Sequence, residues 1–94
     1  MDEVVVTDVP ERSRWEAHLD GELAGVATYR REGRVVTFVH TEVDPAFEGR
    51  GIGGALARAS LDAARAAGDR VDPQCPFYAS WIGKHPDYAD LVIA

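Results

Sequence analysis

Four glycines lie within eight residues of one stretch, Phe47-Glu48-Gly49-Arg50-Gly51-Ile52-Gly53-Gly54. The stretch directly precedes the only long helix-like run of the chain, residues 52–67. Glycine permits positive φ and lets backbone N–H groups approach a ligand without a Cβ atom between them. These N–H groups open onto a helix N-terminus, which carries roughly half a positive charge. The stretch therefore predicts a site for a phosphate-bearing ligand.

Length and composition restrict the remaining possibilities. The chain has 94 residues, 46% of them hydrophobic and 28% charged, so we expect one domain, residues 1–94, with one core. The net charge of −6 provides no basic surface for nucleic acid or an anionic membrane, and no apolar run approaches the roughly 20 residues of a membrane span. A single cysteine excludes a multi-cysteine metal site, and no metal is expected. The N-terminus lacks signal-peptide features, so we expect a cytoplasmic protein.

The half of the chain before the glycines has the signals of an antiparallel meander. Apolar and polar residues alternate over residues 15–19, and Asp20-Gly21 then marks a tight hairpin turn. The expected strands are residues 4–7, 15–19, 23–30 and 35–43. The last strand is apolar on both faces, as in a central strand that is covered on both sides. Its two apolar sets are Val35, Val39 and Val43, and Val36 and Phe38.

The half after the glycines predicts a helix, a strand and a second helix. Residues 52–67 contain no proline and many alanines, and Gly68 occupies the position that ends a helix. A short strand at residues 70–72 follows, and Cys75-Pro76 introduces a shorter helix that Pro86 ends. Helical spacing predicts two apolar faces: Ile52, Leu56, Ala59 and Ala63 on the first helix, and Phe77, Trp81 and Ile82 on the second. The order ββββ–α–β–α indicates an α/β fold.

Two other phosphate-binding motifs have to be weighed against this pattern. Residues 49–54 match G-x-G-x-x-G, and Asp69 lies 20 residues after Gly49, as in a dinucleotide-binding fold. That fold needs a strand running directly into the first glycine within a βαβ unit, whereas residues 44–47 intervene here and the preceding strands form hairpins. No Lys-Ser or Lys-Thr follows the glycines, which excludes a Walker loop. A glycine turn that binds nothing is the structural alternative, disfavoured because four glycines cost backbone entropy on folding.

The glycine stretch resembles the acyl-CoA pyrophosphate loop of the GNAT superfamily of N-acetyltransferases, whose pattern is Gln/Arg-x-x-Gly-x-Gly/Ala. Here it reads Glu48-Gly49-Arg50-Gly51-Ile52-Gly53, with Glu48 in the place of Gln or Arg, and we expect the Glu48 side chain to point outward. Further motifs resemble the short single-domain YjdJ-like branch of this superfamily, and the resemblance spans about residues 4–92. They are His40-Thr41-Glu42-Val43, Cys75-Pro76-Phe77, and Trp81 with His85-Pro86-Asp87-Tyr88.

The resemblance implies a GNAT-like mixed sheet of the α/β (α+β) class, in which an antiparallel meander is followed by α-β-α. The central strands 35–43 and 70–72 are expected to splay apart, with the pantetheine arm of the donor in the gap. The implied donor is acetyl-CoA, bound by Val43, Gly49, Arg50, Gly51, Ile52, Gly53 and Gly54. The implied reaction is acetyl transfer to an amine, either a small molecule or a protein lysine or N-terminus. The alternative is a non-catalytic acyl-CoA-binding or regulatory module.

The chain lacks the helical pair that larger GNAT members insert after their first strand. That pair usually helps to shape the acceptor pocket. The acceptor site is therefore expected either to be open to solvent or to be completed by a second subunit in a homodimer.

Three residues near the splayed strand ends are the catalytic candidates: Cys75, His40 and Glu42. A histidine can act as a general base near neutral pH, and Glu42 shares the strand face of His40. Pro76 suits the first position of a helix, so Cys75 is expected at the N-cap, where a thiolate is stabilised. Cys75 would either accept the acetyl group transiently or line the thioester pocket, although a lone cysteine is commonly a small buried hydrophobe. Tyr88 is a weaker candidate for protonating the departing thiolate.

Overall fold

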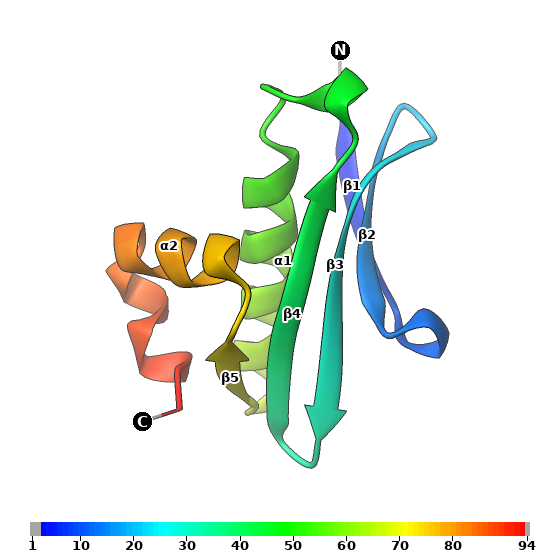
Figure 1. Cartoon of the computed structure of the whole chain (residues 1–94). Coiled ribbons are helices and arrows are strands. Elements are labelled where there is room, and N and C mark those ends of the chain that lie inside the picture. Colours follow the sequence, from blue (N-terminus) through cyan, green and yellow to red (C-terminus); the bar gives the residue numbers. More distant parts are fainter. Residues whose placement is uncertain (1–2, 94) are drawn as a thin grey trace.

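A computed structural model describes residues 3–93 as a five-stranded sheet with two α-helices packed against it (Figure 1). The strands are β1 (Val4–Val9), β2 (Arg14–Leu19), β3 (Glu22–Glu32), β4 (Val35–Val43) and β5 (Arg70–Pro73). The helices are α1 (Ile52–Ala67) and α2 (Pro76–Lys84). Three short 3-10 helices, η1 (Pro10–Arg12), η2 (Pro45–Phe47) and η3 (Pro86–Leu91), were not predicted. The predicted fold class and the order of the main elements are confirmed.

The strands lie in the sheet in the order in which they occur in the chain, β1-β2-β3-β4-β5. The first four are antiparallel neighbours, whereas β5 lies parallel to β4 after the crossover through α1. Asp20 and Gly21, between β2 and β3, have φ values of 52° and 83°. Positive φ at both positions is the signature of a type I′ hairpin turn, which suits the twist of the flanking strands. The predicted meander and mixed sheet are therefore confirmed.

Strand β4 contains a β-bulge at Val39. Thr28 pairs with His40 and Tyr29 pairs with Phe38, so Val39 has no partner on β3. The extra residue shifts the alternation of side chains beyond it. Phe38 is buried before the bulge and Val43 packs against the core after it, whereas Val39 is 42% exposed. The prediction that β4 is covered on both faces was wrong, because the two apolar sets of its sequence reflect this shift.

The core lies between the sheet and the two helices. The buried face of α1 is formed by Ile52, Leu56, Ala57, Ser60, Leu61 and Ala64. The predicted stripe was right at Ile52 and Leu56, but Ala59 and Ala63 are only half-buried. Gly68 ends the helix as predicted, with its N–H directed to the carbonyl oxygens of the last turn. Helix α1 therefore packs against the sheet from its first turn to its last.

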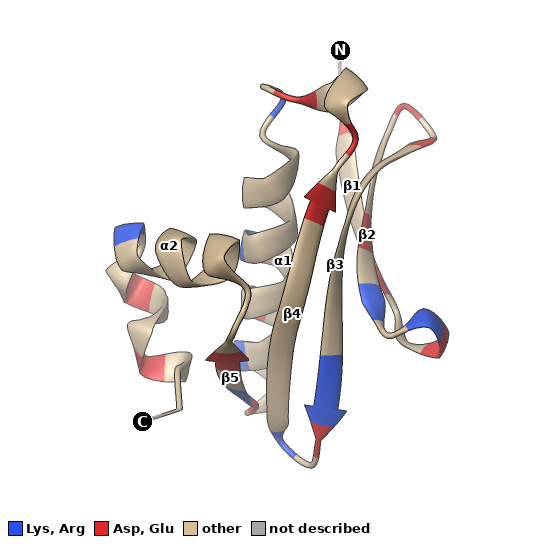
Figure 2. Ribbon diagram, in the orientation of Figure 1, with Lys and Arg blue, Asp and Glu red and all other residues tan. Residues whose placement is uncertain are grey.

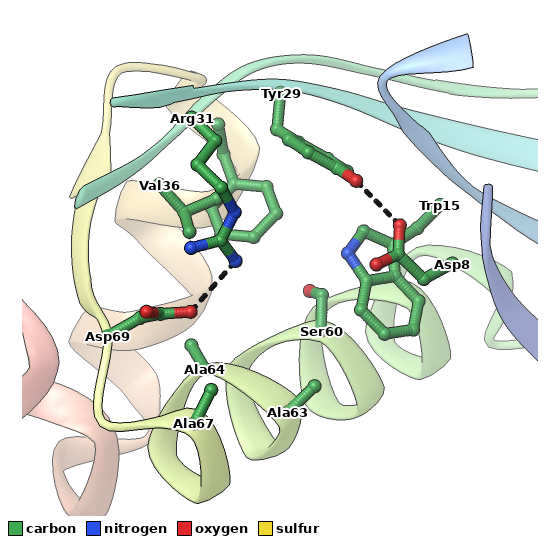
Figure 3. Close-up of a pocket in the computed structure, with 11 residues that line it drawn as sticks. Asp8, Trp15, Tyr29, Arg31, Val36, Ser60, Ala63, Ala64, Ala67 and Asp69 are labelled. Carbon is green, nitrogen blue, oxygen red and sulfur yellow. Dashed lines mark hydrogen bonds and ion pairs between the residues drawn. The ribbon is translucent and has the colours of Figure 1, made fainter. Parts of the chain in front are cut away.

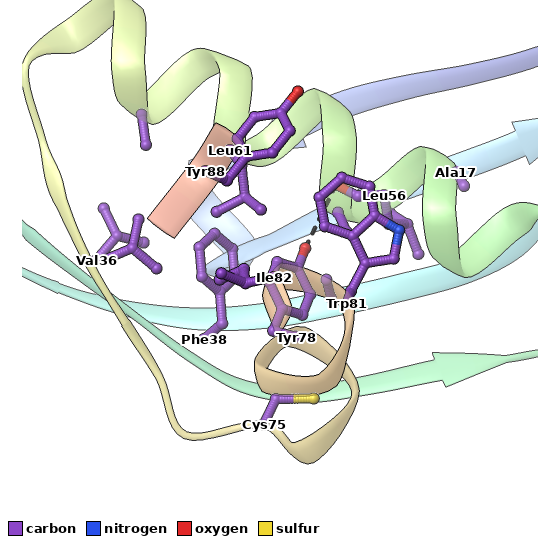
Figure 4. Close-up of a cluster of buried hydrophobic side chains, with 14 of the residues drawn as sticks. Ala17, Val36, Phe38, Leu56, Leu61, Cys75, Tyr78, Trp81, Ile82 and Tyr88 are labelled. Atoms are coloured by element: carbon purple, nitrogen blue, oxygen red, sulfur yellow. Dashed lines mark hydrogen bonds between the residues drawn. The ribbon is translucent and has the colours of Figure 1, made fainter. Parts of the chain in front are cut away.

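The predicted core side of helix α2 was right at Trp81 and Ile82 but wrong at Phe77. Trp81 and Ile82 are buried, but Phe77 is 39% exposed and the neighbouring Tyr78 is fully buried. The Tyr78 ring stacks on Phe38 of β4 with centroids 4.2 Å apart (Figure 4). Its hydroxyl lies 2.8 Å from Ser60 Oγ of α1. Tyr78 therefore joins α2 to both α1 and β4.

Candidate active site

Strand β4 is longer than its pairing with β5. The parallel ladder runs from Val35 and Arg70 to Phe38 and Pro73, and the Cys75 N–H then donates to the Phe38 carbonyl oxygen at 2.8 Å. Beyond that point β4 continues to Val43, paired with β3 alone. Figure 1 shows β5 ending beside the middle of β4, where the chain turns into α2. The central strands are therefore splayed, as predicted, at the end of the sheet where β4 leads to the glycine loop.

The backbone of Val43 faces this gap. One residue further on, the Asp44 N–H donates to the Ala24 carbonyl oxygen of β3 at 2.8 Å. Backbone groups of successive strand residues point to opposite edges, so the N–H and C=O of Val43 are directed away from β3. Val43 is therefore placed to offer hydrogen bonds to a ligand beside β4.

The glycine loop, residues 48–51, turns the chain into α1 with two residues of positive φ. Gly49 and Gly51 have φ values of 82° and 75°, and a Cβ atom at either position would meet no other atom within 4 Å. Gly51 is the N-cap of α1 and has no side chain with which to cap it. The first N–H groups of a helix have no partner within the helix, so those of α1 are suited to an anion. Glu48 and Arg50 are both exposed, in keeping with the expected outward direction of Glu48.

The next three residues of the predicted donor site pack helices together. A Cβ atom on Gly53 would lie 2.8 Å from Phe77 Cζ, and one on Gly54 would lie 3.6 Å from Trp81 Nε1. The Ile52 side chain is buried in the core. Only the backbone N–H groups of these residues are left to bind a ligand. The four glycines thus differ in role, a distinction that the sequence analysis did not make: Gly49 and Gly51 turn the backbone, Gly53 allows Phe77 of α2 to approach α1, and Gly54 has room for a Cβ atom at ordinary contact distance.

The structure places the three catalytic candidates at the same end of β4 but on two faces of it. Cys75 is 2% exposed at the N-cap of α2, as predicted, and its Sγ lies 3.3 Å from Thr41 Oγ1. Side chains alternate along a strand, so those of His40 and Glu42 point to the face opposite to Thr41. Both are exposed. The sequence analysis did not identify Thr41 as a site residue. Its position between His40 and Glu42 could have indicated that its side chain lies on the opposite face of the strand.

Tyr88 does not lie at the gap. Its hydroxyl donates to Asp62 Oδ1 of α1 at 2.6 Å and accepts a hydrogen bond from Arg58 at 3.2 Å. The hydrogen bond to Asp62, together with burial, raises the pKa of Tyr88. Trp81 and His85 stack beside it with ring centroids 3.7 Å apart. Tyr88 is therefore an aromatic packed beneath the end of α2, which is the structural alternative to a role in proton transfer.

A cavity of about 270 Å³ lies at the same end of the sheet, between the start of β3 and the end of β4. Leu23, Val26 and Pro45 contribute apolar walls, and Glu42 and Asp44 contribute carboxylates. Figure 2 shows further acidic residues at this end of the molecule, whereas arginines gather at the opposite end of β3. Carboxylates beside an apolar wall are suited to a positively charged ligand with an apolar part.

The structure bears on two further features, a metal site and a membrane-spanning helix. Within residues 3–93, no group of three or more His, Cys, Asp or Glu side chains is arranged to hold a metal ion. No helix in the described part of the chain is long and apolar enough to cross a membrane.

A mixed sheet with splayed central strands, followed by a glycine turn into the crossover helix, defines the GNAT class of folds. The sequence profile of the GCN5-related N-acetyl-transferase family matches residues 14–91. The chain belongs to this family, and the expectation of an acetyltransferase is thereby confirmed.

Solved structures share the fold. An NMR structure of a GCN5-like protein from Staphylococcus aureus matches 100% of this chain and 92% of its own with a TM-score of 0.74 at 20% identity. The ribosomal-protein-S18-alanine N-acetyltransferase from Escherichia coli matches 76% of this chain and 64% of its own, with a TM-score of 0.62 at 15% identity. Nourseothricin acetyltransferase matches 72% and 55%, with a TM-score of 0.51 at 24% identity. Comparison with curated proteins found no significant match.

Proposed function

We propose that this protein transfers the acetyl group of acetyl-CoA to an amine. Its family supports acetyl transfer. The observation that carries the proposal is that β4 has no partner on its β5 side beyond Phe38 and leads from there to a start of α1 without a side-chain cap. The backbone N–H groups of residues 49–54 are assigned to the CoA pyrophosphate, which the positive end of the helix dipole also attracts. The backbone of Val43 is assigned to the pantetheine arm in the gap. Residues 1–94 are proposed to act as a single domain.

The reaction makes three demands on the protein. The amine must lose a proton, its nitrogen must form a bond to the thioester carbonyl carbon as the C–S bond breaks, and the CoA thiolate must take up a proton. We assign His40 and Glu42 to the first demand, directly or through water, because both are exposed at the open end of β4. Cys75 is assigned to the donor side, where it lines the thioester pocket or accepts the acetyl group transiently.

The acceptor is proposed to enter on the face of β4 that carries His40 and Glu42. The cavity beside Glu42 and Asp44 supports a positively charged amine with an apolar part. The donor would then occupy the Thr41 and Cys75 side, so the two substrates approach the strand from opposite faces.

A non-catalytic acyl-CoA-binding module is the second candidate. The separation of Cys75 from His40 and Glu42 favours it, because Cys75 is 2% exposed and contacts Thr41 instead. This candidate predicts tight binding of acetyl-CoA, no thiol release with any amine, and indifference to His40→Ala or Cys75→Ala.

A thermal-shift panel of acetyl-CoA, CoA, NAD and ATP tests the donor. Acetyl-CoA and CoA are expected to raise the melting temperature, because a ligand at 100-fold excess over its Kd adds about 2.7 kcal/mol to stability. A rise with NAD or ATP alone would show that the proposal is wrong. If none of the four compounds raised the melting temperature, the protein would share the fold but not bind the ligand that the proposal assigns to it.

Thiol release from acetyl-CoA across a panel of amines tests the chemistry. His40→Ala is expected to lower kcat by roughly 10²- to 10⁴-fold, the usual contribution of a general acid or base. His18→Ala is the matched control, since His18 lies on β2, where its Nε2 is 3.8 Å from Glu16 Oε1. Unchanged turnover in Cys75→Ala would remove Cys75 from the mechanism. Binding without thiol release in the wild type would establish the non-catalytic candidate.

A further inference from the structure

A second cavity, of about 170 Å³, lies between the sheet and the second half of α1 (Figure 3). Ala63, on its helical wall, is about 16 Å along the helix axis from Ile52, so the cavity is remote from the glycine loop. On the sheet side it is lined by Val36 and Phe38, in the paired half of β4. A hollow of this size is large enough for a small organic ligand, since an apolar cavity of roughly 150 Å³ accommodates benzene.

Aromatic side chains and alanines form the apolar walls. Trp15 and Tyr29 are half-buried, and the Tyr29 ring meets Phe38 edge to face with centroids 6.3 Å apart. Ala63 and Ala64 form the opposite wall, where a larger residue would fill the space. Figure 3 shows Tyr29 and Trp15 on the sheet side of the hollow and these alanines along the helix.

The charged side chains that line the cavity are Asp8, Arg31 and Asp69, which give it a net charge of −1. Arg31 donates to Asp69 Oδ2 at 2.8 Å, and Arg34, outside the cavity, approaches the same carboxylate at 3.9 Å. Asp8 accepts a hydrogen bond from the Tyr29 hydroxyl at 2.7 Å and has no ion pair within residues 3–93. The Asp8 carboxylate, which lies beside two aromatic rings, is therefore the acidic group at the cavity that has no cationic side chain of residues 3–93 within ion-pair distance.

We propose that this cavity binds a small organic cation, with its ammonium group beside Asp8, Trp15 and Tyr29 and its apolar part against Phe38 and the alanines. A carboxylate next to aromatic faces attracts an ammonium group by charge and by cation–π interaction. The Tyr29 hydroxyl remains a hydrogen-bond donor to Asp8, because burial and the bond to Asp8 raise the pKa of Tyr29 to about 12. Nothing in this site depends on acetyl-CoA.

The cavity is also connected to α2, the helix whose N-cap is Cys75. Phe38 and Ser60 line the cavity, and both contact Tyr78 of α2, the first by stacking and the second through its hydroxyl. The Phe38 carbonyl oxygen accepts the Cys75 N–H. A ligand in the cavity is therefore expected to change the environment of Tyr78 as well as that of the lining residues.

Amide and indole NMR shifts test the site with three probes of similar shape: phenethylammonium, phenethyl alcohol and 3-phenylpropionate. The cation is expected to shift the Trp15 indole N–H and the amides of Tyr29, Ala63 and Tyr78 saturably. The neutral alcohol is expected to bind about tenfold more weakly, because it lacks the ionic and cation–π contributions. Equal binding of all three probes, no saturable shift, or shifts centred on residues 49–54 would overturn the proposal.

Two variants and a matched control test the assignment of the cavity. Asp8→Asn keeps an acceptor for Tyr29 but removes the charge, and is expected to weaken binding of the cation about tenfold. Ala63→Leu fills the cavity and is expected to abolish binding, whereas Ala66→Leu, exposed on the same helix and outside the cavity, is expected to leave it unchanged. Unaltered binding of the cation by the Asp8→Asn variant would contradict the proposal. If Ala63→Leu does not fold, the Asp8→Asn variant decides the question alone. The acetyl-CoA thermal shift of the folded variants is expected to be unchanged, so failure here is distinct from failure of the proposed function.

Discussion

The two halves of β4 share a high content of β-branched residues but have different surroundings. Residues 35–38 pair with both β3 and β5, and the side chains of Val36 and Phe38 are buried. Residues 40–43 pair with β3 alone and Val39 is the bulge, and the side chains of Val39, His40 and Glu42 are exposed. Both halves are rich in β-branched residues, so β-propensity does not distinguish them. The difference comes from the bulge and from the end of β5.

Along this one strand, residues 35–38 support the fold and residues 39–43 lie at the proposed site. The paired half has partners on both edges and a buried face, and it is expected to be among the most stable parts of the molecule. The open half lacks a strand partner on one edge, and its backbone groups there are left to water or to a ligand. Four substitutions, two of them compared with a second variant, test this division in order of decreasing effect.

Phe38→Ala should have the largest effect. It removes a fully buried ring that stacks on Tyr78, and is expected to lower the free energy of unfolding by about 3–5 kcal/mol. Val39→Ala, one residue away in the open half, is expected to change it by less than about 0.5 kcal/mol. Urea unfolding of both variants provides the measurement. Similar losses at the two positions would contradict the division of β4.

Asp69→Asn removes a carboxylate charge that stabilises the end of the sheet where β4 pairs with both β3 and β5. Asp69 is buried and accepts a hydrogen bond from Arg31, which pairs with Val36 of β4. The variant is expected to lose about 1–3 kcal/mol at pH 7, the cost of a buried polar group without its full partner.

The pH dependence of this loss follows from the ion pair. The hydrogen bond from Arg31 lowers the pKa of Asp69 in the folded protein. Its stabilising contribution is therefore complete above the unfolded pKa of about 3.9 and is lost as the pH falls through the lower folded pKa. The difference between wild type and variant in urea unfolding should shrink below about pH 4. An equal difference at pH 7 and pH 3 would argue against the ion pair as its cause.

Gly51→Ala tests the turn that follows the open half. A Cβ atom there meets no neighbour, but φ of 75° is strained for an L-residue, so a loss of roughly 1–2 kcal/mol is expected. Gly54→Ala lies within α1 at an ordinary contact distance from Trp81, and is expected to stabilise by up to about 1 kcal/mol through helix propensity. Thermal unfolding compares the two. Changes of the same sign would contradict this difference between Gly51 and Gly54.

Thr41→Val should have the smallest effect on stability. It keeps the shape of the side chain and removes only the hydroxyl beside Cys75 Sγ, so a loss of about 0.5 kcal/mol or less is expected because a thiol is a weak hydrogen-bond partner. The rate of Cys75 alkylation is the more sensitive measurement, and it should change. An unchanged rate would indicate that Thr41 does not control the thiol.

Local signals in the sequence were sufficient for most of the fold. The bounds of β4 and α1 were predicted as observed, because alternation, the glycines before the helix and Gly68 after it act within a few residues. The same holds for the Asp20-Gly21 turn and for Cys75 at the N-cap of α2. Each depends on backbone conformation near its own position.

The errors arose where one element meets another. The bulge at Val39 depends on the register between β3 and β4, so the sequence of β4 alone did not reveal which valines face the core. The exchange of Phe77 for Tyr78 depends on how α2 docks against Phe38 and Ser60. For the same reason the sequence predicted neither the division of the candidate residues between two faces of β4 nor the contact of Thr41 with Cys75.

The order of the strands bears on how the chain folds. Each antiparallel pair joins strands that are consecutive in the chain, whereas the pairing of β4 with β5 closes a loop that contains all of α1. Longer loops cost more chain entropy to close, so the meander is expected to form early and β5 to join late. Cys75 and one side of the gap arrive with β5 and α2. A partly folded chain would therefore carry His40 and Glu42 without the residues they are proposed to work with, and activity would appear only in the last step of folding.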